Sequence, residues 1–399
     1  MGLERVKQLL NPCALCGACF GRGPEVPHNW RVINPIPAPV RRCPSLEYFK
    51  FRTFTAMDRI TLATLVERED YPITDEFKKV IYSCTMCGVC SEICGMFDPV
   101  DIMLAAREEV AERATLLPVH KTLIENFKTY GNPLRKPDSG KGKWAQNLGI
   151  KDIIREKAEN LFYVGCAIAL RPGLSKIAEK TANLFKQAGV DFGILGGEEK
   201  CCGYLPKMIG DRGLYEKQAA DNIKLFNSLG VKRVITACPE CLATIKSYPR
   251  EARNFEVIHS VQLIDQLIKE GKLKLVKEVK AKVTFHDPCN LSRFARVIDP
   301  PRDILSAIPG IEYVEMKRHG KWSYCCGAGG GARYVSPDFA TFTAKERIKE
   351  ARETGAQILA TACPQCYTFL KGISKDNKNS MRVEDILVLV SEALEPYRQ

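Results

Sequence analysis

The residues with the clearest chemical potential in this sequence are its eighteen cysteines, because they recur in ordered groups. Cys84, Cys87 and Cys90 stand three residues apart, and Cys94 follows four residues later. This spacing lets one loop present three thiolates to a single metal cluster, while the fourth cysteine of such a run ligates a second, neighbouring cluster. The run therefore predicts an iron–sulfur centre.

A second triplet with the same spacing, Cys13, Cys16 and Cys19, lies near the start of the sequence. Cys43, which precedes a proline, supplies a further thiolate after a long gap. We therefore predict two [4Fe–4S] cubane clusters, one held by Cys13, Cys16, Cys19 and Cys94, the other by Cys84, Cys87, Cys90 and Cys43. Structural zinc is the alternative, but it favours two Cys-x2-Cys pairs over triplets.

The remaining ten cysteines form two copies of one pattern. Each copy has a single cysteine, a Cys-Cys-Gly run about 35 residues later, and a Cys-Pro-x-Cys run about 35 residues after that. The two sets are Cys166, Cys201, Cys202, Cys238 and Cys241, and Cys289, Cys325, Cys326, Cys363 and Cys366. Corresponding cysteines are 123 to 125 residues apart, so this part of the chain is an internal repeat.

Five thiolates per repeat exceed the needs of ordinary metal sites. Structural zinc closes at four ligands, and a cubane takes four. The count predicts a larger or irregular iron–sulfur assembly, or four ligands with a reactive fifth cysteine. Gly203 and Gly327 follow the vicinal cysteines and permit the tight turn that would aim both thiolates at one site.

The second repeat carries additional features. Cys326 runs into a glycine-rich stretch that includes Gly327 and Gly329 and allows close approach of a cluster or substrate. His286, three residues before Cys289, could deliver protons near neutral pH, or it could simply hydrogen-bond backbone at a strand end. We take as candidate catalytic residues Cys289, Cys325, Cys326 and His286, and as candidate cofactor-binding residues Gly203, Gly327 and Gly329.

Short apolar strand candidates alternate with helix candidates in each repeat. The expected strands are residues 160–165, 191–195 and 233–236, then 282–285, 311–315 and 357–361. The expected helices are residues 173–188, 214–229, 302–308 and 337–353. This alternation predicts two homologous α/β domains with Rossmann-like parallel sheets. The cysteines then follow strand carboxyl ends, where open α/β sheets place their ligand sites.

The region before the repeats has a helical pattern, for example in residues 101–114 and 117–130. We therefore expect an α plus α/β chain with a helical two-cluster domain at 1–130. A basic, Gly- and Pro-bearing connector follows at 131–158, and we expect it to be solvated. The two cysteine-rich domains are expected at 159–278 and 279–399.

Composition excludes several classes of protein. A chain of 399 residues, 45% hydrophobic and 27% charged, is typical of globular proteins, and no apolar run is long enough to span a bilayer. We found no signal peptide and expect a cytoplasmic protein, with membrane association through a partner left open. In that compartment eighteen cysteines indicate metal rather than disulfides. The net charge of +12 is scattered, so we expect no nucleic-acid partner.

The doubled motif Cys-x(34–35)-Cys-Cys-Gly-x(34–35)-Cys-x2-Cys is highly specific. Through it, residues 160–370 resemble the tandem cysteine-rich CCG domains of the B-type heterodisulfide reductase proteins. With residues 1–130 included, nearly the whole chain resembles the fused D-type form, in which a helical ferredoxin-like module precedes that pair. The resemblance implies that each five-cysteine set holds a non-cubane [4Fe–4S] cluster, and that the paired clusters cleave a mixed disulfide of two thiol coenzymes.

The resemblance leaves two functions open. The first is a catalytic heterodisulfide-type reductase subunit, for which the basic charge would suit an anionic disulfide substrate. The second is an electron relay within a larger anaerobic complex of the flavoprotein, 2-hydroxy-acid, sulfite or benzoyl-CoA type. A third alternative is a zinc-holding assembly surface. Since no flavin or nicotinamide fingerprint is present, we expect electrons from a partner: a flavoprotein, a ferredoxin-like subunit or a membrane cytochrome.

Overall fold

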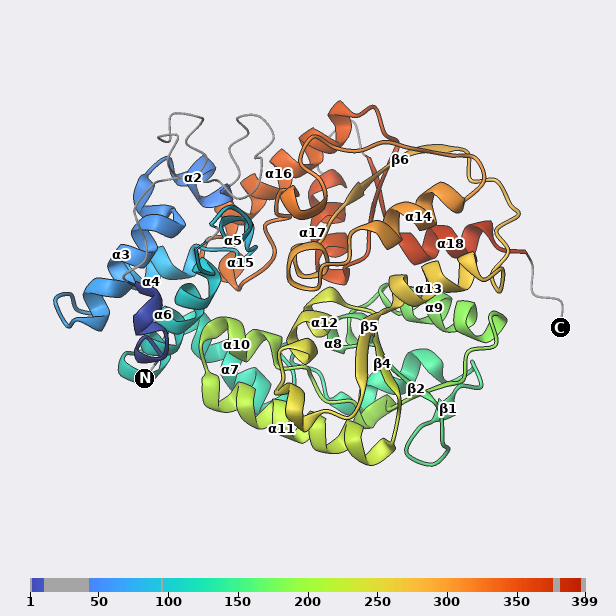
Figure 1. The fold of residues 1–399 in the computed structure, drawn as a ribbon, viewed down its shortest axis with the longest axis horizontal. Helices are drawn as coiled ribbons and strands as arrows, with labels where there is room; N and C mark the ends of the chain where they lie inside the picture. Colours follow the sequence, from blue (N-terminus) through green and yellow to red (C-terminus); the bar gives the residue numbers. More distant parts are fainter. Residues whose placement is uncertain (1, 11–42, 95, 376–380, 396–399) are drawn as a thin grey trace.

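The computed structural model describes residues 2–10, 43–94, 96–375 and 381–395. A helical N-terminal part lies beside two α/β parts, which stack on each other (Figure 1). The fold class expected from the sequence, helices followed by two parallel-sheet α/β units, is confirmed. No helix in the described ranges is both long enough and apolar enough to cross a membrane.

The helical part is organised around its longest helix. Its helices are α1 (Lys7–Leu10), α2 (Pro44–Phe49), α3 (Ala56–Glu67), α4 (Asp75–Tyr82), α5 (Val89–Ile93), α6 (Pro99–Arg113) and α7 (Pro118–Tyr130). Asp98 caps α6 by accepting a hydrogen bond from the backbone N–H of Val100 at 2.8 Å, and Pro99 occupies the first turn, where it is well tolerated. Ile102, Met103 and neighbouring apolar side chains of α6 are buried, and helices α3, α4 and α5 pack against it.

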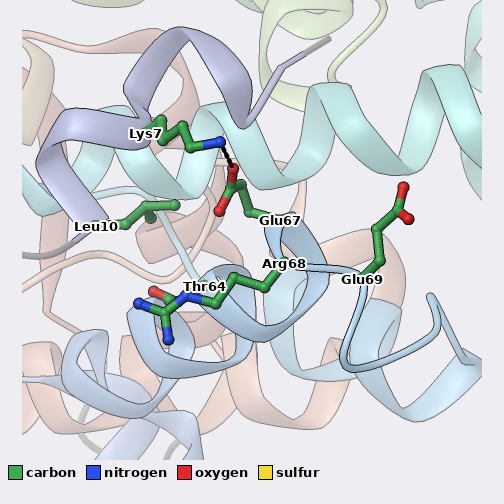
Figure 2. Close-up of a pocket in the computed structure, with 6 residues that line it drawn as sticks. All are labelled: Lys7, Leu10, Thr64, Glu67, Arg68 and Glu69. Atoms are coloured by element: carbon green, nitrogen blue, oxygen red, sulfur yellow. Dashed lines mark ion pairs between the residues drawn. The ribbon is translucent and has the colours of Figure 1, made fainter.

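Helices α1 and α3 contact each other beside a surface pocket that residues of both helices line (Figure 2). Lys7 Nζ lies 2.8 Å from Glu67 Oε1, and Leu10 packs into the apolar core of the helical part. Because the Lys7 side chain is 58% exposed to solvent, we expect the apolar contact of Leu10 to contribute more to holding α1 than the ion pair does.

The first α/β part contains a parallel sheet with the strand order β1-β3-β2-β4-β5. Its strands are β1 (Lys151–Asp152), β2 (Asn160–Tyr163), β3 (Phe192–Ile194), β4 (Arg233–Thr236) and β5 (Glu256–His259). Its helices are α8 (Cys166–Leu170), α9 (Ser175–Gln187), α10 (Tyr204–Ile209), α11 (Arg212–Leu229), α12 (Pro239–Lys246) and α13 (Ser260–Lys269). The central strands β2 and β4 are almost wholly buried, as expected for parallel strands covered on both faces.

The second α/β part repeats this plan with the order β7-β6-β8-β9, again with every pairing parallel. Its strands are β6 (Ala281–His286), β7 (Ile311–Tyr313), β8 (Ile358–Thr361) and β9 (Arg382–Asp385). Its helices are α14 (Asp299–Ala307), α15 (Ala332–Val335), α16 (Pro337–Glu353), α17 (Pro364–Lys375) and α18 (Ile386–Ala393). Helices α9 and α13 of the first part pack against α18 and α14 of the second, so the two repeats face each other (Figure 1).

Two features differ from the sequence expectations. Strands β5 and β9, at corresponding edges of the two sheets, were not expected. The connector 131–158, expected to be solvated, contains the 3-10 helix η4 (Asp138–Ala145) and strand β1, which pairs with β3. Lys141 of η4 is buried and donates to the carbonyl of Glu199 at 2.6 Å, so this segment belongs structurally to the first α/β part.

Replacing Gly210 by alanine should destabilise the fold more than replacing Gly230, although both glycines end helices with positive φ. A methyl group at Gly210 (φ 95°) would lie 2.2 Å from the carbonyl oxygen of Arg107, whereas nothing lies within 4 Å at Gly230 (φ 66°). We expect Gly230→Ala to cost about 1 kcal/mol of unfolding free energy, from backbone strain alone. Gly210→Ala should cost about 3 kcal/mol or more because overpacking is added. Thermal unfolding of both variants followed by circular dichroism measures this, and equal losses would contradict the packing described.

Candidate metal centres

The second five-cysteine set gathers at the carboxyl edge of its sheet. Cys289 follows β6, and Cys363 and Cys366 lie between β8 and the first turn of α17. Cys325 and Cys326 come from the loop before α15, and Cys326 Sγ lies 3.3 Å from Cys366 Sγ. Cys289 and Cys325 are also adjacent, so the five thiols converge although they come from three separate segments.

The first set has the same arrangement. Cys166 begins α8 directly after β2, and its Sγ lies 3.9 Å from that of Cys201. Cys202 and Cys238 both lie next to Cys241, which belongs to the first turn of α12 after β4. The five cysteines of each repeat are thiols without disulfide bonds. Soft thiolates grouped in this way are the donor set that iron–sulfur clusters use.

The two sets meet at Cys238 and Cys363, whose thiols are adjacent. Glu240 is buried at the same junction. Burial, with the negative charge of Cys238 beside it, raises the pKa of the Glu240 carboxyl to about 8. The resemblance implied that the two sets act as a pair, and the packing of the two α/β parts shows which cysteines adjoin.

Two arginines, one from each repeat, lie beside this junction. Arg171 Nη1 donates to Gln365 Oε1 at 2.7 Å, and Arg333 Nη1 donates to the same oxygen at 3.4 Å. Both guanidinium charges also act on Glu240 and favour its ionised form. The sequence analysis did not single out the two arginines, Glu240 or Gln365. Glu240 and Gln365 occupy the same variable position of the two Cys-Pro-x-Cys motifs, and this shared position is the signal that could have found them.

His286 is the last residue of β6 and is fully buried. Its Nδ1 accepts a hydrogen bond from Arg347 Nε at 3.0 Å, which places the ring proton on Nε2. His286 forms one compact group with Cys326 and Cys366, with one ligand atom from each lying within 4.8 Å of the others. Burial and the Arg347 charge hold the pKa of His286 well below its usual range. The geometry therefore favours a neutral hydrogen-bond donor over the proton delivery considered from the sequence.

The glycines after the vicinal cysteines adopt the backbone expected of them. Gly203 and Gly327 have φ of 82° and 87°, and the Gly327 N–H donates to Cys325 Sγ at 3.3 Å. Gly329 and Gly330 differ from the expectation, because the space that they leave is filled by the helical part. A methyl group at Gly330 would lie 2.6 Å from the backbone of Thr85. The glycine run is thus an interface between parts of the chain.

The thiols of the N-terminal region form a third group. Cys84, Cys87 and Cys90 follow α4 and reach into α5, and Cys43 precedes the first residue of α2. Burial raises the pKa of the Cys43 thiol to about 11. Cys84 and Cys87 lie close enough to Cys43 to contribute to this rise by charge repulsion. Cys94 ends α5. Its expected partners Cys13, Cys16 and Cys19 lie outside the described residues.

This third group touches the second repeat. Cys87 packs in one small apolar cluster with Cys325, with Cys289 and Trp322 against it. Arg293 of the second α/β part donates to the carbonyl of Cys87 at 2.9 Å. The ferredoxin-type thiols and the second five-cysteine set are therefore direct neighbours, which no spacing in the sequence indicates.

Comparisons with known proteins agree with this arrangement. Residues 160–246 and 283–371 each match the family model described as a cysteine-rich domain (CCG), and residues 8–96 match a 4Fe-4S dicluster domain. The D-type heterodisulfide reductase protein of Methanosarcina mazei is 32% identical over 396 residues, which is 96% of this chain and 94% of that one. The chain belongs to the D-type heterodisulfide reductase family.

Two further relatives of the chain differ in how much of their own length the match covers. The D-type heterodisulfide reductase protein of Methanosarcina barkeri is 34% identical over 80% of this chain and 79% of that one. A protein of Syntrophomonas wolfei named EtfAB:quinone oxidoreductase is 30% identical over 79% of this chain, but that match spans 47% of its own length. The chain is thus an iron–sulfur oxidoreductase of the D-type heterodisulfide reductase family, with 4Fe-4S and CCG domains.

A pair of substitutions at His286 tests the tautomer. Asparagine cannot place a donor where Nε2–H lies, whereas glutamine reaches about as far and can. Nε2 is buried and has no hydrogen-bond partner among the described residues, so its proton is available to a group bound at these thiols. We expect His286→Asn to alter the electron paramagnetic resonance signal of the second-repeat centre, with His286→Gln close to the unchanged protein. Because His286 is neutral, the pH profile of activity around neutrality should keep its shape in both. A profile that changes in both variants would show instead that the imidazole titrates.

Proposed function

We propose that this chain is the disulfide-reducing subunit of a redox complex. It would hold two [4Fe–4S] cubanes and two non-cubane [4Fe–4S] clusters. The cubane ligands in this proposal are Cys13, Cys16, Cys19 and Cys94, and Cys84, Cys87, Cys90 and Cys43. The non-cubane ligands are Cys166, Cys201, Cys202, Cys238 and Cys241, and Cys289, Cys325, Cys326, Cys363 and Cys366.

One observation carries this proposal: the two five-cysteine sets adjoin at Cys238 and Cys363. When bound there, iron–sulfur clusters supply electrons one at a time, so two neighbouring centres match the two electrons that cleavage of a disulfide requires. The complete sets in both repeats also argue against a zinc scaffold, since zinc closes at four ligands.

The surroundings of the junction support an anionic disulfide as substrate. Arg171 and Arg333 bring two guanidinium groups to it, one from each repeat. Guanidinium groups recognise carboxylate, sulfonate and phosphate through paired hydrogen bonds. Of the candidate catalytic residues, Cys289, Cys325 and Cys326 belong to this centre, and His286 would act through its Nε2–H.

Contact between Cys87 and Cys325 supports a path from the ferredoxin-like region into the second repeat. Electrons would reach that region from a redox partner, which we propose is a flavoprotein, a ferredoxin-like subunit or a membrane cytochrome. The domain limits 1–130, 131–158, 159–278 and 279–399 are part of this proposal. The structure of the connector supports moving residues 138–158 to the first cysteine-rich domain.

An electron relay is the second candidate function. It is favoured by the likeness to the Syntrophomonas protein, whose name pairs EtfAB with a quinone in an oxidoreduction. In that case the same centres would connect a flavoprotein to another acceptor, and the junction would bind no disulfide.

Metal analysis with spectroscopy of the anaerobically purified chain separates these functions. We expect about sixteen irons per chain, about four for each site. A new electron paramagnetic resonance signal should appear with thiols under oxidising conditions. Cys326→Ala and Cys202→Ala, matched positions of the two repeats, should each reduce or abolish that signal. Cys94→Ala should leave it, because Cys94 belongs to a cubane in this proposal.

The other outcomes are equally informative. Full iron content with no thiol-dependent signal would favour the relay. About eight irons together with zinc would contradict disulfide chemistry and leave the repeats as a scaffold.

A further inference from the structure

Three arginines with buried side chains surround the loop that carries Cys84 and Cys87. Arg59 and Arg107 come from helices α3 and α6, and Arg293 comes from the π-helix η7 (Asn290–Phe294) of the second α/β part. Their exposed fractions are 1%, 0% and 3%. Three guanidinium charges are therefore removed from water around one group of cysteines.

All three arginines bond backbone carbonyls. Their bonds around the cysteine loop are from Arg59 to Val80 O (2.9 Å) and Ser83 O (3.0 Å), from Arg107 to Ile81 O (3.2 Å) and Cys84 O (2.8 Å), and from Arg293 to Cys87 O (2.9 Å). Such bonds satisfy the last carbonyls of α4 and shape the loop. They do not neutralise the charges, because a carbonyl is only a dipole.

In the part of the chain that the structure describes, none of the three forms an ion pair with a carboxylate. The ionisable groups with the largest electrostatic effect on Arg107 are Cys84, Tyr82, Arg59 and Tyr204. His120, next to Tyr82, adds no charge, since burial and Arg107 lower its pKa to about 3. Among these described neighbours of Arg107, Cys84 is the one that would carry a compensating negative charge when it ligates a cluster as a thiolate.

Other buried cations in the described residues lie next to a carboxylate. Arg347 lies 2.9 Å from Glu350, and Arg302 lies 2.8 Å from Asp287. Lys141, beside the first five-cysteine set, lies 3.0 Å from Asp138. Since an unpaired buried charge is strongly unfavourable, three such charges in one place indicate that a buried anion belongs there.

We propose that Arg59, Arg107 and Arg293 are positioning residues that raise the reduction potential of the cluster held by Cys43, Cys84, Cys87 and Cys90. This inference rests on the proposed function, because it requires a cluster at these thiols. Reduction adds one negative charge to such a cluster, and fixed positive charges in a medium of low dielectric constant stabilise the reduced form more than the oxidised form. An electron would then be retained where the helical part meets the second α/β part.

Paired substitutions separate charge from shape. Glutamine keeps a planar hydrogen-bond donor and removes the charge, whereas lysine keeps the charge and loses the planar fork. We expect Arg59→Gln, Arg107→Gln and Arg293→Gln each to disfavour reduction of this cluster about tenfold, a lowering of about 59 mV for one electron. The lysine variants should titrate close to the unchanged protein. The measurement is a redox titration followed by electron paramagnetic resonance on the full chain, with the signal assigned by its loss in Cys84→Ala.

Arg302→Gln is the matched control, because Arg302 is a largely buried arginine whose charge is already paired with Asp287. It should leave this midpoint potential unchanged. Glutamine variants that bind the cluster and titrate at the unchanged potential would overturn the inference and leave the proposed function standing. If Cys84→Ala removes no cluster signal that the unsubstituted protein shows, both the inference and the proposed function fail.

Loss of the cluster itself is also decisive. If the glutamine variants lose it and the lysine variants keep it, the positive charge is needed to hold an anionic cluster, which supports the inference. If the lysine and glutamine variants both lose it, the guanidinium fork rather than its charge is required, and the inference fails.

Discussion

The guanidinium group of Arg107 donates hydrogen bonds to all three parts of the chain, and the relative position of the cysteine groups depends on it. Besides the loop of Cys84, it bonds the carbonyl of Met208 in the first α/β part at 2.7 Å and that of Gly330 in the second at 2.6 Å. Close backbone approaches at Gly210 and Gly330 accompany these bonds, and a side chain at either glycine would separate the parts. One buried cation thereby positions the thiols of the helical part against the second five-cysteine set.

The symmetry of the two repeats explains how their five-cysteine sets come into contact. In each repeat the cysteines follow the carboxyl ends of parallel strands, and the two repeats stack through equivalent helices. The Cys-Pro-x-Cys turns consequently come face to face, with Cys238 beside Cys363 and two arginines around them. Internal duplication thus supplies two similar groups of thiols, and the packing of the repeats brings them together.

Much of the fold could be predicted, because its signals are local. The helix expected at 101–114 is α6, and the strand expected at 233–236 is β4, with an apolar pattern that matched its burial. The edge strands were missed for physical reasons. Strand β5 runs directly into α13, so its apolar residues merge with the helical pattern. Strand β9 contains Glu384, which it tolerates because Lys176 of the other α/β part lies 3.1 Å away.

The sequence by itself determined the number of cysteines, their spacing, the internal repeat and the family, because ligand motifs are short and keep their spacing along the chain. Only the tertiary structure decided which groups are neighbours. The adjacency of Cys87 and Cys325, the junction at Cys238 and Cys363, and the three buried arginines around the cysteine loop all join residues distant in sequence. The scattered arginines were expected to form a solvated basic surface, but several are buried, and three of these surround the cysteine loop. Burial and long-range contact decide which charges matter, and neither can be read from spacing.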